Sequence, residues 1–316
     1  MTSARIMHWV LLALIPGTAA MVFIWGAGIL WNIALTSFFC CAIEALAVFL
    51  YAKPGAAVPS TGRLHAIGFH LQDCTALVTA WLIAICLPPY TAAEHLLLAG
   101  AAAIGLAKHA YGGMGRNVFN PAMVGYAVVL VCFPQGLASW PSANAVEVDV
   151  LSGATLLSEF RYRPGLTTSE FDATYATIVA GQTFVALCFL VGGLLLTIKG
   201  LIAWRIPVAM FAALGACAVL GYDQGSSLSM GSAWFHWTGG GFVAAAFFVA
   251  TDPVTHPREA RQQVLFGLVI GIFIYAIRAF GAYPDGIAFA VLFANAMTPL
   301  LNRIGARRTL EARTSG

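Results

Sequence analysis

The strongest constraint on the fold of this chain is a series of long apolar segments that follow one another from Met7 to Leu301. A helix needs about 20 apolar residues to cross a bilayer, and fewer where neighbouring helices bury it. Only 9% of the residues are charged, whereas about a quarter are charged in soluble domains. We therefore expect an all-α integral membrane protein. The basic residues are scattered over loops, which argues against binding of nucleic acid.

The apolar segments predict about ten transmembrane helices. Their approximate ranges are Met7–Trp25, Trp31–Tyr51, Asp73–Leu87, Ala92–Ala107, Asn120–Phe133, Tyr175–Ile198, Pro207–Tyr222, Gly240–Thr251, Gln263–Phe280 and Asp285–Leu301.

These segments divide into two groups of five, and because five is an odd number the second group would run with inverted topology. Short segments interrupted by Gly and Pro occur at matching places in both groups, which is the sequence sign of two inverted five-helix repeats with discontinuous helices. A plain bundle with Pro-rich loops is the alternative. The predicted organisation is a first repeat at 1–133, a loop at 134–174 and a second repeat at 175–316.

The basic residues predict the orientation. With an inside N-terminus, every Lys and Arg except Arg161, Arg163 and Arg278 falls on the inner side, as the positive-inside rule requires. Both termini are therefore predicted to be cytoplasmic and the 134–174 loop to lie outside, which is the periplasm if the membrane is a bacterial inner membrane. The first apolar run lacks a small-residue cleavage site, so we expect a retained helix rather than a removed signal peptide.

The seven cysteines all lie inside apolar runs. No CxxC pair and no Cys/His spacing suits a metal, so no metal site is predicted. We expect the cysteines to be buried apolar residues.

Four polar residues within or beside the segments are candidates for an ion path. Glu44 lies in the middle of the second segment, where a carboxylate must face the bundle interior or be protonated. Asn117 and Asn120 follow a Gly-rich turn and could hold an ion or the polar edge of a flavin ring. Asp252 ends the eighth segment in a Thr-Asp-Pro sequence. The alternatives are a neutral Glu44 bonded to a neighbouring helix and a purely structural helix end at Asp252.

Two further aspartates have a structural interpretation. Asp73 is expected to cap the third segment. Asp285 is expected to cap the tenth segment, with Arg278 as an ion-pair partner. The Gly112-Gly113-x-Gly115 sequence follows no strand and has no later acidic partner, so it does not predict a dinucleotide site.

The polar loop contains the sequence Asp149-x-x-Ser152-Gly153-Ala154-Thr155. By itself this stretch is typical of a turn followed by a helix N-cap. It also resembles the recognition sequence of a flavin transferase, which joins FMN through its phosphate to a Thr hydroxyl. The resemblance implies covalent FMN on Thr155.

Four ordered segments of the rest of the chain carry a further resemblance: Asp73–Ala80, Gly115–Met123, Ala250–Thr255 and Tyr283–Leu292. They resemble one family, which contains the RnfD component of the Rnf electron-transport complex and the NqrB component of the sodium-translocating NADH:quinone reductase. The compact chain favours the Rnf member.

This resemblance implies a membrane subunit of a redox-driven ferredoxin:NAD⁺ oxidoreductase complex that moves Na⁺ or H⁺. It further implies a second, non-covalent flavin, for which riboflavin is the candidate. The implied partners are the other membrane and peripheral subunits, a flavin transferase and membrane lipid. Because the soluble substrates bind other subunits, the isolated chain should show no turnover. The alternatives are a cofactor-free secondary transporter with an inverted-repeat fold and an assembly scaffold with a vestigial flavin site.

Overall fold

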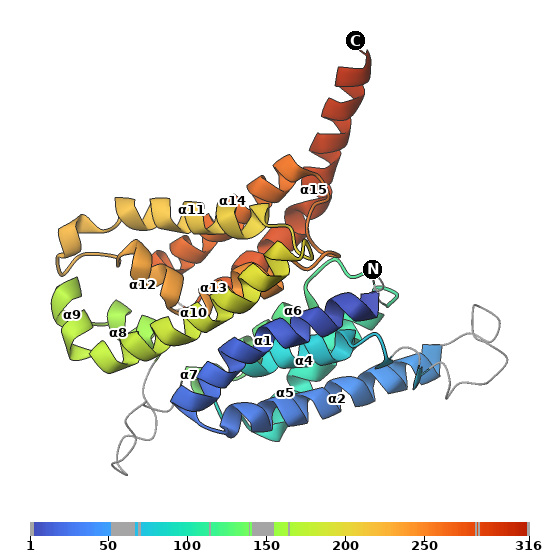
Figure 1. Ribbon diagram of the computed structural model, residues 1–316, viewed down its shortest axis with the longest axis horizontal. Helices are drawn as coiled ribbons and strands as arrows, with labels where there is room; N and C mark the ends of the chain where they lie inside the picture. Colours follow the sequence, from blue (N-terminus) through green and yellow to red (C-terminus); the bar gives the residue numbers. More distant parts are fainter. Residues whose placement is uncertain are drawn as a thin grey trace. The chain divides into compact units, whose positions relative to one another are not determined.

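The computed structural model describes residues 3–51, 67–68, 71–113, 115–138, 140, 155–163, 165–281, 283 and 285–314. Throughout these ranges the regular elements are helices (Figure 1). The chain divides into two compact units. Unit one comprises 1–117 and 121–153, and unit two comprises 118–120 and 154–316.

Unit one contains the first seven of the described helical elements. These are α1 (Ser3–Trp25), α2 (Gly28–Tyr51), α4 (Thr75–Ile85), α5 (Ala93–Gly100), the π-helix η1 (Ala101–His109), α6 (Pro121–Cys132) and α7 (Pro134–Ala138).

Unit two contains the other ten described helical elements. These are α8 (Leu156–Arg161), α9 (Thr168–Thr174), α10 (Ala176–Ile198), α11 (Arg205–Leu220), the 3₁₀ turn η2 (Asp223–Gly225), α12 (Ala233–Thr238), α13 (Phe242–Ala244), the π-helix η3 (Ala245–Val249), α14 (Ala260–Phe280) and α15 (Ile287–Thr314).

Every segment predicted from the sequence contains a helix, so the all-α prediction is confirmed. Four helices, α1, α2, α10 and α14, are long and apolar enough to cross a membrane, and shorter apolar helices accompany them. The most extensive packing in unit one joins α2 to α4, whereas in unit two it joins α11 to α14. In unit one α2 packs as extensively against the fourth segment, which comprises α5 and η1, as against α4. These contacts do not distinguish a repeat from a plain bundle, and the ten-span inverted repeat stays a prediction.

The fourth and eighth segments each change from α-helix to π-helix. In η1 the Ala110 amide donates to the Gly105 carbonyl, and in η3 the Ala250 amide donates to the Ala245 carbonyl. Both bonds span five residues, which widens the turn and shifts the side chains that follow. Just before η3, Gly240 and Gly241 adopt left-handed backbone angles with φ of 64° and 72°, which separates α12 from α13.

Close approach of α11 and α14 depends on two small residues one turn apart. A Cβ on Gly267 would lie 2.6 Å from the Ile206 carbonyl oxygen, and one on Gly271 would lie 2.7 Å from that of Met210. Small residues at this spacing let the backbones of two helices approach closely. Such packing stabilises helix association in a bilayer, where the lipid is also apolar and the hydrophobic effect does not bring helices together. The pairing is parallel, because both residue numbers rise together along the two helices.

The expectation that the cysteines are buried is correct only for Cys40. Cys132 is exposed and the other five are half-buried. The reason is physical: an apolar side chain suits a lipid-facing surface as well as a protein interior, so an apolar setting in the sequence does not indicate burial.

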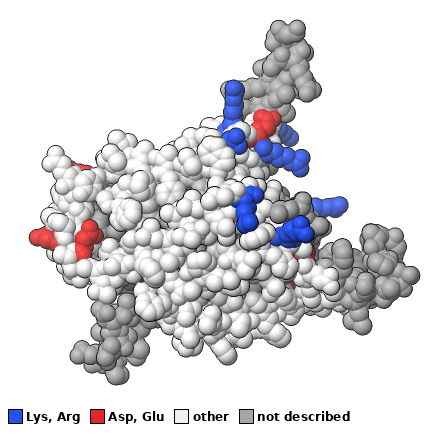
Figure 2. All heavy atoms as spheres, in the orientation of Figure 1, with Lys and Arg blue, Asp and Glu red and all other residues white. Residues whose placement is uncertain are grey.

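Charge is unevenly distributed between the two ends of unit two. Figure 2 shows Asp and Glu over the end that carries α8 and α9, whereas Lys and Arg, together with some acidic atoms, lie over the opposite end. The basic residues at or beside the helix termini there are Lys199, Arg205, Arg258 and Arg261, and Arg303 lies inside α15. The acidic residues at the other termini include Glu159, Glu170, Asp172 and Asp223.

Candidate functional site

Thr155 is the only residue of the predicted flavin motif among the described residues, and it is the N-cap of α8. Its backbone is extended, and its Oγ1 accepts a hydrogen bond from the Ser158 amide at 3.3 Å. This is the N-cap geometry expected of a Thr before a helix. The other motif residues, Asp149, Ser152, Gly153 and Ala154, lie outside the described residues.

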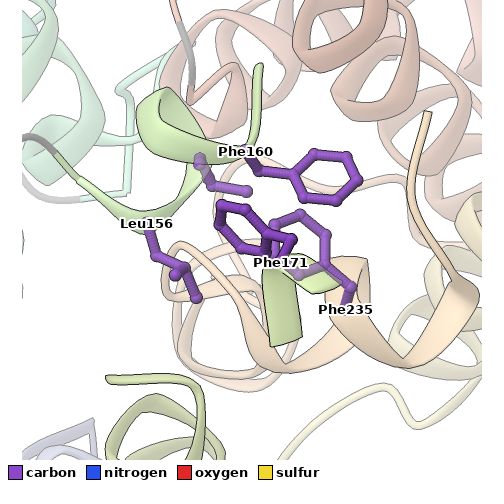
Figure 3. Close-up of a cluster of buried hydrophobic side chains, with 5 residues drawn as sticks. Leu156, Phe160, Phe171 and Phe235 are labelled. Atoms are coloured by element: carbon purple, nitrogen blue, oxygen red, sulfur yellow. The ribbon is translucent and has the colours of Figure 1, made fainter. Parts of the chain in front are cut away.

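The short helix after Thr155 is held by a cluster of aromatic and aliphatic side chains. Phe160 from α8, Phe171 from α9 and Phe235 from α12 converge on one another (Figure 3). The ring centroids of Phe160 lie 5.0 Å from Phe171 and 4.3 Å from Phe235. Leu156 and Leu157 complete the cluster. Because a six-residue helix is not stable by itself, this packing fixes the position of Thr155.

Arginine side chains tie the same region to the rest of unit two. The Arg163 guanidinium lies 3.8 Å from the Phe160 ring centroid and donates to the carbonyls of Phe160 and Leu166. Arg161 donates through Nη1 to the Arg278 carbonyl at 3.2 Å. These two residues are among the three basic residues that the sequence places outside, and the structure gives both of them local contacts.

Buried Arg278 donates hydrogen bonds to the backbone at the break between α12 and α13. Its Nη1 donates to the His236 carbonyl at 2.8 Å and its Nη2 to the Gly239 carbonyl at 3.1 Å. The predicted ion pair with Asp285 is confirmed at 3.6 Å, and Asp285 also accepts from the Ile287 amide at the start of α15. Burial and the Arg278 charge lower the pKa of His236 to about 4, so this imidazole is neutral at pH 7.

The segment that follows α8 contains a second capped helix. Thr167 and Glu170 form a capping box at the start of α9, in which each side chain bonds the other residue's backbone amide. The hydrogen bonds from Thr167 lower the pKa of the exposed Glu170 carboxyl. This Thr resembles Thr155 in local role and therefore offers a matched comparison for it.

A polar chain in unit two joins two of the predicted ion-path residues. The Asn120 amide donates to Asn295 Oδ1 at 2.9 Å, and Asn120 Nδ2 donates to the Val249 carbonyl at the end of η3. Thr255 Oγ1 donates to Asp252 Oδ2 at 3.3 Å. Asn295 Nδ2 lies 3.5 Å from the Thr255 carbonyl. Asn120 and Asp252 thus belong to one hydrogen-bonded cluster.

Asp252 is the ionisable member of this cluster. Burial raises the pKa of its carboxyl, although hydrogen bonds from the Val254 amide and Thr255 act in the opposite direction. The side chain keeps some exposure. The recorded partners of this carboxylate are hydrogen-bond donors, the Val254 amide and the Thr255 hydroxyl. This arrangement fits the structural interpretation as a helix end, and the place of Asp252 on an ion path stays a prediction.

Glu44 lies in unit one and is paired with a cation. Lys108 Nζ donates to both carboxylate oxygens of Glu44 and to Thr75 Oγ1, each at 2.9 Å. Thr75 in turn donates to Asp73 Oδ1 at 2.7 Å. His109 Nε2 lies 3.2 Å from Glu44 Oε2 but lacks hydrogen-bond geometry. Both basic residues come from the end of η1.

Asp73 and Asn117 complete the predicted polar residues of unit one. Asp73 Oδ1 accepts from the Thr75 amide at 2.8 Å, so it acts at the start of α4 as predicted, although the cap position itself is Cys74. Asn117 is buried. It belongs to unit one, whereas Asn120 belongs to unit two.

Sequence reasoning missed Lys108 and Asn295. In the sequence Lys108 serves only as an orientation signal, but its side chain is in fact 5% exposed in an ion pair. Asn295 is fully buried in α15. Asn295 lies between Ala294 and Ala296 in an apolar run, and this position is the signal that could have identified it as a candidate. A polar side chain inside a membrane helix usually has a partner.

Together these features define a class: a polytopic helical membrane protein with broken helices and buried polar clusters. Comparison with known sequences gives the family. The chain belongs to the NQR2, RnfD, RnfE family, whose model matches residues 1–311.

Several relatives match nearly the whole chain. A protein of Ectopseudomonas mendocina, named as the D component of an ion-translocating oxidoreductase complex, is 39% identical, and the match covers 94% of this chain and 89% of the relative. The protein of the same name from Cellvibrio japonicus is 37% identical over 97% of this chain and 90% of its own. That of Salmonella paratyphi B is 34% identical over 95% and 92%.

Proposed function

We propose that this chain is a membrane subunit of an ion-translocating oxidoreductase complex of the Rnf type. Family membership over nearly the whole chain and the names of the relatives support this assignment. The soluble substrates would bind other subunits, so the chain alone would have no turnover. Electron relay coupled to Na⁺ or H⁺ movement is its part in the complex.

The proposed redox group is FMN joined by a phosphoester to Thr155. The observation that carries the proposal is the position of Thr155 at the start of a helix fixed by the Phe160 cluster. Within the described residues Thr155 Oγ1 acts only as an acceptor, so replacing its hydrogen with phosphate breaks no bond recorded there. A flavin transferase would make this ester. The bound flavin would supply one- and two-electron transfer.

The chain's own residues would position that group. The aromatic cluster and Arg163 hold α8, and Arg161 joins α8 to the Arg278 carbonyl. The basic residues at one end of unit two support a topology with the C-terminus cytoplasmic and Thr155 periplasmic, and the basic residues of the whole sequence support a cytoplasmic N-terminus. A flavin on that face would be a relay that receives electrons after they have crossed the membrane, because NAD and ferredoxin would be inside.

The polar clusters are the proposed elements of ion coupling. Asn120, Asp252 and Asn117 are candidates for an ion path or for contacts of a second flavin such as riboflavin. Glu44 is a candidate only together with Lys108, since its carboxylate already has a resident cation. Coupling would require that reduction of a flavin change the ion affinity of one of these groups.

Fluorescence on a denaturing gel tests the flavin attachment. The wild-type chain, produced together with a flavin transferase, should fluoresce under ultraviolet light and gain the mass of one FMN less water. Thr155→Val should abolish both signals. Thr167→Val is the matched control, because it removes another helix cap in the same segment and should keep both signals. A fluorescent Thr155→Val chain would exclude attachment at this residue.

The alternative is a cofactor-free secondary transporter, which the broken helix at Gly240 and Gly241 favours. Discontinuous helices place polar groups at mid-membrane in such proteins. The same experiment separates the two functions. An unmodified mass for the wild-type chain in the presence of an active transferase would support the transporter.

A further inference from the structure

An apolar groove lies between α10 and α11. Its volume is about 390 Å³, and its floor is Phe247 of η3. The walls are Leu190, Leu194, Thr197, Trp204, Pro207, Val208 and Phe211. The volume is at the lower end of the range for small-molecule sites.

The spacing of the lining residues shows that the groove runs along α10. Leu190, Leu194 and Thr197 recur at helical intervals and so line one face of α10. Gly193 lies on the same helix, and a Cβ at this position would overlap the Phe247 ring. Because Gly193 has no side chain, the Phe247 ring can pack against α10 at the floor of the groove. A short loop joins α10 to α11, which places Thr197 and Trp204 at the same end of the groove.

The groove offers almost no polar group to a ligand. Thr197 is its one hydroxyl, and its Oγ1 donates to the Gly193 carbonyl at 2.9 Å. Val208 and Leu194 are 57% and 46% exposed. A water-soluble ligand would leave its polar groups unpaired here, whereas a hydrocarbon chain would bury apolar surface on both sides.

The end of the groove is cationic. Lys199 follows α10 and is exposed. Arg205 begins α11, and its guanidinium carbon lies 5.1 Å from the centroid of the Trp204 ring. Trp204 is 51% exposed. Trp beside Lys and Arg at the end of a membrane helix is typical of the level of lipid headgroups.

We propose that this groove binds one acyl chain of an anionic glycerophospholipid whose phosphate is held by Lys199 and Arg205. The apolar walls select the chain, and the two cations at the Thr197 and Trp204 end select the charge of the headgroup. This lipid would cover the junction of α10 with η3, the π-helix that ends at the Asn120 cluster.

Native mass spectrometry of the full chain tests this proposal. The probes are dioleoyl phosphatidylglycerol and dioleoyl phosphatidylcholine, which have the same chains but differ in charge. Phosphatidylglycerol should be retained preferentially by the wild type. Lys199→Gln/Arg205→Gln should weaken its retention roughly 30-fold, since each cation near anionic lipid contributes about 1 kcal/mol and 1.4 kcal/mol is a factor of ten.

Two controls make the result specific. Arg258→Gln/Arg261→Gln neutralises two exposed arginines at the same end of unit two and should leave retention unchanged. Val208→Trp fills the groove and should reduce retention of both lipids, whereas Val219→Trp, at an exposed position of α11 outside the groove, should not.

Three outcomes would overturn the proposal. Equal retention of both lipids by the wild type would exclude charge selection. Displacement of phosphatidylglycerol by excess inorganic phosphate, with no effect of Val208→Trp, would indicate a simple anion site. Protection of the groove by another subunit's helix in the intact complex, with no lipid retained, would assign the surface to a protein interface.

Discussion

Lys108 changes the interpretation of Glu44. A carboxylate inside a membrane helix is expensive unless it is protonated or paired, and here the ammonium group is bound to both of its oxygens and to Thr75. The π-helical turn of η1 contributes, because it brings Lys108 and the neighbouring His109 to the same carboxylate. Glu44 and Lys108 therefore act as one unit with no net charge.

This pairing predicts how the two residues respond to mutation. Lys108→Met should destabilise the protein by about 3–5 kcal/mol, because it leaves a buried carboxylate without its partner. Glu44→Gln/Lys108→Met should cost less than Lys108→Met alone, since neither residue then bears a charge. Unfolding of the purified chain in mixed micelles measures both. A double variant no more stable than the single one would contradict the pairing.

Single residues also show the limit of sequence-based prediction. The partners of Asp285 and Asp73 lie within a few residues along the chain or at one adjacent helix end, and both interactions were predictable. The partners of Glu44 and Asn120 lie far away in the sequence, and Asn120 meets Asn295 from a distant helix. Nothing in an apolar run identifies such a partner without the fold.

At the scale of elements, α8 depends on its neighbours. Phe171 is fully buried between the rings of Phe160 and Tyr175, with centroids 5.0 Å and 4.5 Å away. The helix that carries Thr155 is therefore held by a small core built from α8, α9 and α12. A precise attachment geometry would require this core to be intact.

Truncation of that core should disturb α8. Phe171→Ala should cost about 3–5 kcal/mol, the usual loss for a fully buried Phe, and should speed hydrogen exchange of the Leu156–Arg161 amides. Phe184→Ala in α10 is the control, because that ring is 47% exposed and should have little effect. Unchanged exchange in Phe171→Ala would show that α8 is held by other contacts.

The positions of the helices were predictable, but their internal geometry and pairing were not. Mean apolar character locates a membrane helix, as it did for α10 and α14. Both the lipid-facing side and the buried side of a membrane helix are apolar, so apolar character does not show which helices pair. The change to π-helix in η1 and η3 arises in runs of Ala, Gly and Phe that would equally suit an α-helix.

At the scale of the whole molecule, the charged residues at the ends of the helices in unit two predict the orientation of the chain in the membrane. A periplasm-active reporter inserted after Ser158 should be active, and one inserted after Gly200 should be inactive, because α10 separates these two points and only Gly200 adjoins the basic end. A cytoplasm-active reporter should give the opposite pattern at both positions. Activity of the periplasmic reporter at Gly200 would invert the predicted topology.

The assignment of residues 118–120 to unit two has a consequence for how the gene could be divided. A cut after Gly153, between the two halves of the chain, would leave Asn120 on the N-terminal fragment and deprive Asn295 Oδ1 of its donor. The C-terminal half alone would then lack a piece of its own interior. Separately encoded halves should be recoverable only when made in the same cell, as complementing fragments rather than independent modules.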